Sequence, residues 1–537
     1  PYDRNEKSLA YIPYGQGDIY VQGAFNGGKS RDFLQLINEL DKNINIDLDN
    51  DVIALWHDES QLNRYIIGKE YKLLDPGYIY PEGWDLPFKA KIIGRDKSKW
   101  GGHQDLRGIK EPTFIEKLKA YKQKLDQDPE NTVDLFEFNT ERLLYTGTAS
   151  AAYKVYVEEG VDVGESAANL NSQVQEMFDF SGLKNDPTDP NNDSTNVKTT
   201  IRLMQPYGLA YAYVDHVGIQ RDYEPGMLRT DQESLNSVLW ATVHEVGHQM
   251  DIDARAWPEI TNNMWANNAH IKQGFDDRVN YTYIYKYLAP EKSLRGFEEM
   301  DYFQKLGMFW QLQLKKDTYW TELESLYRKR KPSPNNYQQK KDILATYSSE
   351  VLNINLTYYF EKYGFDLSDE CKEKLKKYPT SNEKLWYLNS SVMNYEGQGF
   401  DNVDTNLDVT LSKSKSNIKL TMNINKSIKN DLLGYEIIKD GKVIGFTTES
   451  SYTDNEANDN SKYEVVPYAK NLTTGRNVEI SSSTPNISLQ QEKVTLKIGE
   501  DFNAKDYVKG FTYFGDDITS KIEVDSNVNT NECGTYT

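Results

Sequence analysis

The sequence predicts a multidomain α+β protein, and its length and its changing hydrophobic periodicity are the observations that predict this class. At 537 residues the chain exceeds the roughly 250–300 residues at which a single hydrophobic core stops growing. Its 38% hydrophobic and 12% aromatic content is enough for packed cores and excludes wholesale disorder. The periodicity predicts a β-rich N-terminal domain, a mostly helical domain after it and β-sandwich modules at the C-terminal end.

Residues 1–108 are predicted to form the β-rich N-terminal domain. The segment GDIYVQGAF, residues 17–25, alternates like a strand, and DPGYIYPEGWDLP, residues 75–87, is rich in turn residues. At least one helix, SRDFLQLINELDKN at residues 30–43, interrupts the strands. The domain also holds three tryptophans, which we expect in its core rather than on its surface as platforms for sugars: Trp56, Trp84 and Trp100.

Residues 109–395 are predicted to form the second domain, which begins with a short α/β segment and continues as helices. Two long stretches, residues 297–331 and 340–364, carry apolar residues at the three- and four-residue spacing of amphipathic helices. Between residues 185 and 199, NDPTDPNNDSTNVKT lacks the ligand spacing of an EF-hand. We therefore expect a solvated loop there rather than a calcium site.

Two β-modules are predicted to follow, at residues 402–482 and 484–537. The first contains a hairpin with an Asp440–Gly441 turn and is similar to fibronectin type III modules. The second resembles a bacterial immunoglobulin-like surface repeat and stops inside a strand pattern, which indicates a truncated domain. Such modules are typical of secreted or wall-associated multidomain proteins, so we expect a secreted or cell-surface bacterial protein.

Composition narrows the classes of partner and of metal site. A net charge of −20 argues against nucleic-acid binding, because phosphate repels such a surface. No run approaches the roughly 18 apolar residues that cross a bilayer. The two cysteines, Cys371 and Cys533, fall in different predicted domains, which excludes a disulfide framework and a cysteine zinc cluster. Any metal must therefore be held by histidine and carboxylate.

The sequence TVHEVGHQM places two histidines four residues apart on a predicted helix over residues 231–251. Thr230 and Glu233 form a capping-box pattern at its start. His244 and His248 project from the same side of the helix and can share one Zn²⁺ ion. Glu245 then lies beside the metal, where it can take a proton from a water molecule. The alternative is an ordinary amphipathic helix that carries two histidines.

A catalytic zinc site needs a third protein ligand. The metzincin pattern is rejected because the chain has Asp251 and Ala254 where that class has glycine and histidine. Glu259 is better placed, since a turn after the first helix and a second helix starting near Pro258 would bring its carboxylate back to the histidines. Asn263, four residues beyond Glu259, is predicted to hold the other ring nitrogen of a ligand histidine.

His244-Glu245-Val246-Gly247-His248, followed by Glu259 within WPEITNN, resembles the gluzincin group and, more closely, the enhancin-like, M60-type zinc metallopeptidases. The resemblance covers about residues 110–370. It implies that His244, His248 and Glu259 bind zinc and that Glu245 is the general base. It further implies a secreted endopeptidase that cleaves mucins or other glycosylated host proteins and contacts their glycans. Two alternatives are a glycan-binding surface adhesin with an inactive site and a peptidase acting on the producer's own surface proteins.

Two further features of a peptidase site are left with alternatives. The strand LAYAYVDHVGI, residues 209–219, is either an edge strand that pairs with an extended substrate or an internal strand of its sheet. Stabilisation of the oxyanion needs a tyrosine or histidine beyond Glu259. The candidates are Tyr281, Tyr283, Tyr285 and His270.

Overall fold

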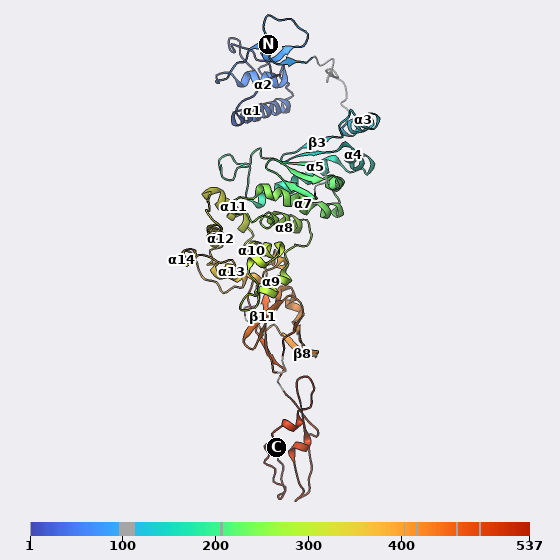
Figure 1. The fold of residues 1–537 in the computed structure, drawn as a ribbon, viewed down its shortest axis with the longest axis vertical. Coiled ribbons are helices and arrows are strands. Elements are labelled where there is room, and N and C mark those ends of the chain that lie inside the picture. Colours follow the sequence, from blue (N-terminus) through green and yellow to red (C-terminus); the bar gives the residue numbers. More distant parts are fainter. Residues whose placement is uncertain are drawn as a thin grey trace. The chain divides into compact units, whose positions relative to one another are not determined.

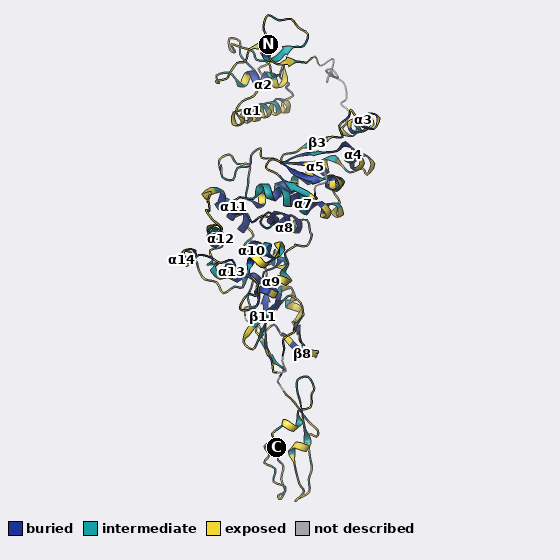
Figure 2. Cartoon of the chain, viewed as in Figure 1, coloured by how far each residue is buried: buried dark blue, intermediate teal, exposed yellow. Residues whose placement is uncertain are grey.

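The computed structural model describes residues 2–95, 113–204, 208–401, 403–414, 417–457, 460–482 and 485–536. The chain divides into two compact units, Pro1–Glu111 and Pro112–Thr537, and each is described by itself. Figure 1 shows the order of the elements along the chain, and Figure 2 shows buried residues in both units, most densely around the helices of the second unit. In the described segments no helix combines the length and apolarity that crossing a bilayer demands.

The expectation of a β-rich N-terminal domain is wrong. Over residues 2–95 this unit contains helices α1 (Ser30–Asp49) and α2 (His57–Tyr65), and the strands there, β1 (Tyr80–Pro81) and β2 (Ile93–Gly94), are each two residues long. The helix predicted over residues 30–43 is confirmed as part of α1.

The alternating segment at residues 17–25 pairs with no strand in the described part of this unit, because side chains of α2 bond to its backbone. The amide of Asn63 accepts from Val21 N–H at 2.9 Å and donates to Val21 carbonyl at 2.8 Å. The carboxylate of Glu59 accepts from Gly23 N–H at 2.7 Å. Alternation therefore produced an extended segment but not a sheet.

The tryptophans of this unit also differ from expectation. Trp56 is 49% exposed and Trp84 is 65% exposed, so neither belongs to a core. Trp100 lies outside the described residues.

The second unit starts with a five-stranded sheet in the order β3-β4-β5-β7-β6. Strands β4, β5 and β7 are parallel, whereas β3 and β6 run antiparallel at the two edges. The bounds are β3 Phe136–Asn139, β4 Leu143–Gly147, β5 Thr199–Met204, β6 Ala210–Ala212 and β7 Val217–Gln220. Alternate residues of the parallel strands are buried. They pack in one core with apolar side chains of α5 (Val163–Phe180) and α7 (Gln232–Met250).

The loop at residues 185–199 is organised around an arginine side chain. Arg142 is buried, and its guanidinium donates to Asn185 Oδ1 at 2.5 Å and to the carbonyl of Ser194 at 2.8 Å. The carboxylates of Asp186 and Asp193 accept from N–H groups two residues further on. A protein cation and local turns thus satisfy the oxygens of this loop.

The rest of the domain is helical, as predicted. These helices bury large aromatic side chains, including the fully buried Trp265, Trp310 and Trp320. Helices α3 (Phe114–Gln127), α4 (Ala149–Tyr153) and α6 (Glu224–Leu228) belong to the part of the chain that also forms the sheet. The later helices are α8 Asn263–Lys272, α9 Tyr281–Leu288, α10 Tyr302–Lys315, α11 Tyr319–Arg330, α12 Tyr337–Leu352, α13 Thr357–Lys362 and α14 Asp369–Leu375.

Two sheets follow and pack on each other through a second hydrophobic cluster that includes Leu420, Ile437 and Val465. Asp440 and Gly441 both have positive φ, +50° and +80°, and join β10 to β11 as the predicted hairpin turn. The first sheet contains β8 Asp408–Ser414, β9 Asn417–Asn423 and β12 Ser451–Asp454, and the second contains β10 Leu432–Lys439, β11 Lys442–Thr447, β13 Lys462–Ala469 and β14 Val478–Ser481.

The last segment of the chain holds one two-stranded sheet. Strands β15 (Asn486–Leu489) and β16 (Val508–Phe511) are antiparallel. Cys371 is buried, Cys533 is exposed, and neither forms a disulfide.

The second sheet also packs on the helical region, so the two share a continuous core. Phe446 of β11 stacks on Tyr387 with ring centroids 4.0 Å apart, and its ring meets Tyr285 of α9 at 4.9 Å. Glu436 of β10 is buried and accepts from the hydroxyl of Tyr387 at 2.6 Å. These contacts make the sandwich an integral part of its unit rather than a tethered spacer.

Candidate active site

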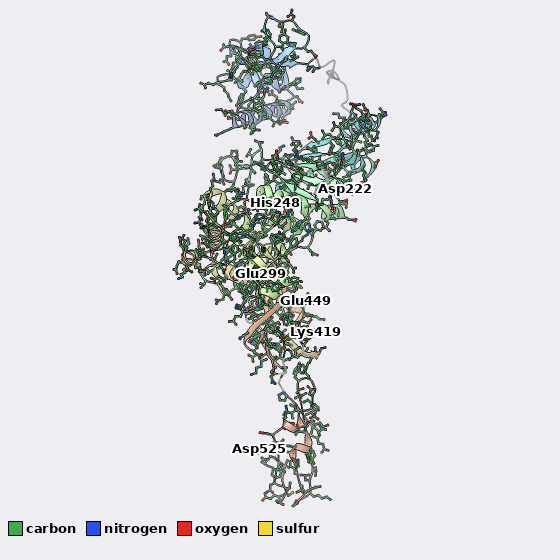
Figure 3. All side chains as sticks on the ribbon, viewed as in Figure 1. Asp222, His248, Glu299, Lys419, Glu449 and Asp525 are labelled. Carbon is green, nitrogen blue, oxygen red and sulfur yellow. The ribbon has the colours of Figure 1, made fainter. Side chains whose placement is uncertain are left out.

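Helix α7 spans Gln232–Met250 and carries both histidines, close to the predicted range. Its N-cap is Asp231, whose carboxylate accepts from Ser234 N–H at 2.9 Å, so the expected capping role of Thr230 is wrong. The apolar residues of α7, including Val243 and Val246, are buried, whereas the side chains of His244 and His248 are 16% and 25% exposed. Figure 3 labels His248 on this helix. The helix thus fixes both imidazoles at the edge of the core.

Glu259 reaches the two histidines from a turn, not from the start of a helix. Helix α8 begins at Asn263, so the prediction of a helix from Pro258 is wrong. Glu259 has φ +64°, a left-handed conformation in which an α-helix cannot continue. Its Oε2 lies 3.1 Å from His244 Nε2 and its Oε1 lies 3.2 Å from His248 Nε2. The three predicted metal ligands therefore converge.

This donor set fits Zn²⁺. Ligands arranged tetrahedrally at Zn–N and Zn–O distances of about 2.0–2.1 Å lie roughly 3.3–3.4 Å from one another. The two separations of the Glu259 carboxylate from the ring nitrogens, 3.1 Å through Oε2 and 3.2 Å through Oε1, are each close to that value. Burial lowers the pKa of His248, which favours the neutral imidazole that a metal requires.

Asn263 supports a ligand histidine as predicted. Its Oδ1 lies 2.6 Å from His244 Nδ1, and its own amide nitrogen donates to the carbonyl of Glu259 at 2.8 Å. Because Oδ1 can only accept, His244 carries its proton on Nδ1, and its Nε2 therefore has the lone pair that a metal would bind. Asn263 therefore orients both a histidine ligand and the turn that holds Glu259.

Glu245 lies with the two histidines, and one ligand atom from each of the three residues falls within 4.8 Å of the others. Burial raises the pKa of Glu245, its electrostatic interaction with the neighbouring His244 lowers it, and the nearby Glu259 carboxylate raises it again. A carboxylate whose proton affinity is raised in this way suits a general base.

Asn262 is a site residue that the sequence reasoning missed. It is fully buried, and its amide nitrogen lies 3.1 Å from His244 Nε2 and 3.0 Å from His248 Nε2. Its backbone passes so close to α7 that a Cβ added to Gly247 would lie 2.5 Å from the Asn262 carbonyl oxygen. The glycine at position 247, between the two histidines, is the feature of the sequence that could have indicated this contact, because a residue without a side chain allows another backbone to approach closely.

The segment predicted as one strand, residues 209–219, forms two antiparallel strands, so both alternatives hold in part. β6 lies at the edge of the sheet and, among the described residues, pairs with β7, whereas β7 is internal between β5 and β6. The side chain of Gln249, on α7, donates to the carbonyl of Tyr213 at 2.8 Å and so ties this edge to the histidine helix.

Two of the oxyanion candidates are engaged elsewhere. The hydroxyl of Tyr281 donates to Asp277 at 2.7 Å, and the buried Tyr285 donates to the carbonyl of Tyr387 at 3.0 Å. His270 is buried against the rings of Trp240 and Phe275. Tyr283 is 45% exposed, and it stays a prediction together with His270.

Comparison with known proteins supports a metallopeptidase. Residues 107–364 match the family described as Peptidase M60, enhancin and enhancin-like. The M60 catalytic domain of Clostridium perfringens ZmpC, solved in complex with the sialyl T antigen, is similar at TM-score 0.61 and 26% identity over 70% of this chain and 75% of that chain. The ZmpB metallopeptidase of the same organism gives TM-score 0.62 and 26% identity over the same shares. These similarities support an M60, enhancin-like metallopeptidase domain, a family that implies a metal.

The N-terminal unit is similar to a different family. Residues 1–100 match glycosyltransferase family 6. The O-antigen biosynthesis glycosyltransferase WbnI of Escherichia coli is 39% identical over 105 residues, which are 19% of this chain and 45% of that protein. The histo-blood group ABO system transferase 2 of Rattus norvegicus is 40% identical over 111 residues, 20% of this chain and 32% of that protein. The chain thus spans less than half the length of these transferases.

Proposed function

We propose that this chain is a zinc-dependent endopeptidase of the gluzincin type that hydrolyses peptide bonds in mucin-type or other glycosylated host proteins. The observation that carries the proposal is the Glu259 carboxylate, whose two oxygens lie 3.1 Å and 3.2 Å from the Nε2 atoms of His244 and His248. Glycan binding by an adhesin with an inactive site would not require the Glu259 carboxylate to lie beside the two imidazoles.

His244, His248 and Glu259 would hold the ion. Zinc, when bound, polarises the scissile carbonyl and lowers the pKa of the attacking water. Glu245 takes the proton of that water and returns it to the nitrogen of the leaving amine. The free edge of β6 pairs with the extended substrate backbone and sets its register beside α7.

The structure of ZmpC with the sialyl T antigen supports a glycosylated substrate for a similar domain. A substrate of this kind would be met outside the cell, so we propose that the protein is secreted or associated with the bacterial surface.

The test is incubation of the purified full chain with a mucin-type glycoprotein, with and without a zinc chelator, together with metal analysis. We expect cleavage that the chelator abolishes and that added zinc restores, with about one zinc ion per chain. Glycan binding without any chelator-sensitive cleavage would favour the adhesin. Cleavage of the producer's surface proteins but not of mucin would favour the other peptidase.

For the N-terminal unit we propose a role in carbohydrate recognition. It is supported by the similarity of residues 1–100 to glycosyltransferase family 6 and by two exposed indoles, Trp84 at 65% and Trp56 at 49%. Exposed aromatic side chains offer large apolar faces at little entropic cost on binding.

Replacement of Trp84 by alanine is expected to weaken retention of the full chain on immobilised blood-group-type glycans by about tenfold, as for an interface hot spot. Retention is measured in a Glu245→Gln background so that the ligand is not cut. The matched control is Leu489→Ala, which removes an apolar side chain that is 64% exposed on β15. Equal retention of all three proteins would contradict the role of Trp84.

A further inference from the structure

The loop at residues 251–262 joins α7 to α8 and carries Glu259 on irregular backbone. A non-glycine residue at φ +64° is strained and persists only where its surroundings hold it. The contacts that hold this loop therefore decide where the Glu259 carboxylate lies.

One buried hydroxyl joins both sides of the Glu259 turn to the end of α7. Thr261 is fully buried, and its Oγ1 donates to Asp251 Oδ2 at 2.6 Å. The same oxygen accepts from Trp257 N–H at 2.8 Å. Trp257 and Thr261 flank Glu259 by two residues on either side, and Asp251 is the C-cap of α7. The hydroxyl thus closes the turn and fastens it to the histidine helix.

Asp251 is itself held in place by buried charges. Its Oδ1 accepts from the guanidinium of Arg255 at 2.5 Å, and Arg255 Nε lies 2.6 Å from Glu324 Oε1 on α11. The Arg255 side chain is 0% exposed and lies over the ring of Trp320 at 4.3 Å. Burying charges is costly, so such a network is retained where it fixes one geometry. Here it fixes the carboxylate to which Thr261 is bonded.

We propose that Thr261, acting through Asp251, is a positioning residue that presents Glu259 to the zinc ion. This inference rests on the proposed function in taking zinc as the bound metal. Without the hydroxyl, the Asp251 oxygen and the Trp257 N–H lose a buried partner, and the left-handed turn loses the contacts that hold it. The Glu259 carboxylate then leaves its place between the two imidazoles, and the metal is held less tightly.

The test compares two substitutions at this residue in the full chain. Thr261→Val keeps the shape and removes the hydroxyl, whereas Thr261→Ser keeps the hydroxyl. The dissociation constant for zinc is measured by competition with a chromogenic chelator. We expect valine to weaken zinc binding by about 10–100-fold, as for other residues behind metal ligands, and serine to restore it to within about threefold of wild type.

A stability control separates positioning from general loss of structure. Leu420→Ala removes a fully buried side chain in the second hydrophobic cluster, which contains none of the site residues. It is expected to lower the unfolding temperature and to leave the zinc affinity unchanged. If the valine variant does not fold, Asp251→Asn is measured instead, and it is expected to weaken zinc binding by about tenfold or more.

The outcomes distinguish this proposal from the proposed function. Unchanged zinc affinity in Thr261→Val, or an equal loss in Leu420→Ala, overturns the positioning role. Zinc binding by the wild type without cleavage of any glycoprotein overturns the proposed substrate and leaves the positioning role standing. Failure of the wild type to bind zinc overturns both.

Discussion

Glu245→Gln is expected to bind zinc as the wild type does and to lose about 10²–10⁴-fold in kcat/KM, the usual contribution of a general acid–base group. The amide is nearly isosteric with the carboxylate but cannot accept the proton of the attacking water. Glu245 is the residue next to His244, and it takes no part in the contacts of 3.1 Å and 3.2 Å between Glu259 and the two histidines, so its replacement is expected to leave these contacts in place. The rate is measured on a glycopeptide and the metal by elemental analysis.

The matched control is Glu233→Gln, the same substitution on the exposed first turn of α7. It is expected to change neither zinc content nor kcat/KM by more than about twofold, since surface substitutions of this kind have small effects. If kcat/KM of Glu245→Gln stayed within tenfold of the wild-type value, Glu245 would not be the general base. Loss of zinc together with turnover would show instead that the substitution damages the metal site.

The placing of the two histidines could be predicted because helix geometry fixes it. Two histidines four residues apart must share a face of α7, and this follows from the sequence alone. Asn263 was predicted by the same reasoning, and its contact with His244 at 2.6 Å confirms it. The backbone conformation at Glu259 could not be predicted. Its left-handed turn depends on Thr261, on Asp251 and on contacts with residues far along the chain.

The N-terminal unit shows where periodicity fails as a guide. Alternation at residues 17–25 indicates a strand only if another strand pairs with it. Here the polar side chains of Asn63 and Glu59 take the backbone groups of Val21 and Gly23. Such long-range side-chain contacts leave no local pattern in the sequence.

The sandwich shows a related limit. The hairpin at Asp440–Gly441 follows from local turn chemistry, and the structure confirms it. One feature of the sequence indicates that the sandwich packs on the helical region. The segment LLGYEII in β10 is nearly continuously apolar, which is typical of a strand buried on both faces. The pattern indicates that a second face is covered but does not identify the residues that cover it.

Phe446→Ala is expected to destabilise the unit by about 3–5 kcal/mol, the usual cost of removing a buried phenylalanine side chain. The ring of Phe446 is 4% exposed and stacks on Tyr387, with ring centroids 4.0 Å apart. Because this contact joins the sandwich to the helical region, denaturant unfolding should show both regions lose stability in one transition. The matched control is Phe25→Ala. The ring of Phe25 is 44% exposed, so its removal is expected to lower the free energy of unfolding by less than about 1 kcal/mol. If the sandwich unfolded earlier while the helical region kept its midpoint, the two would be separate modules and the shared core would contribute little to stability.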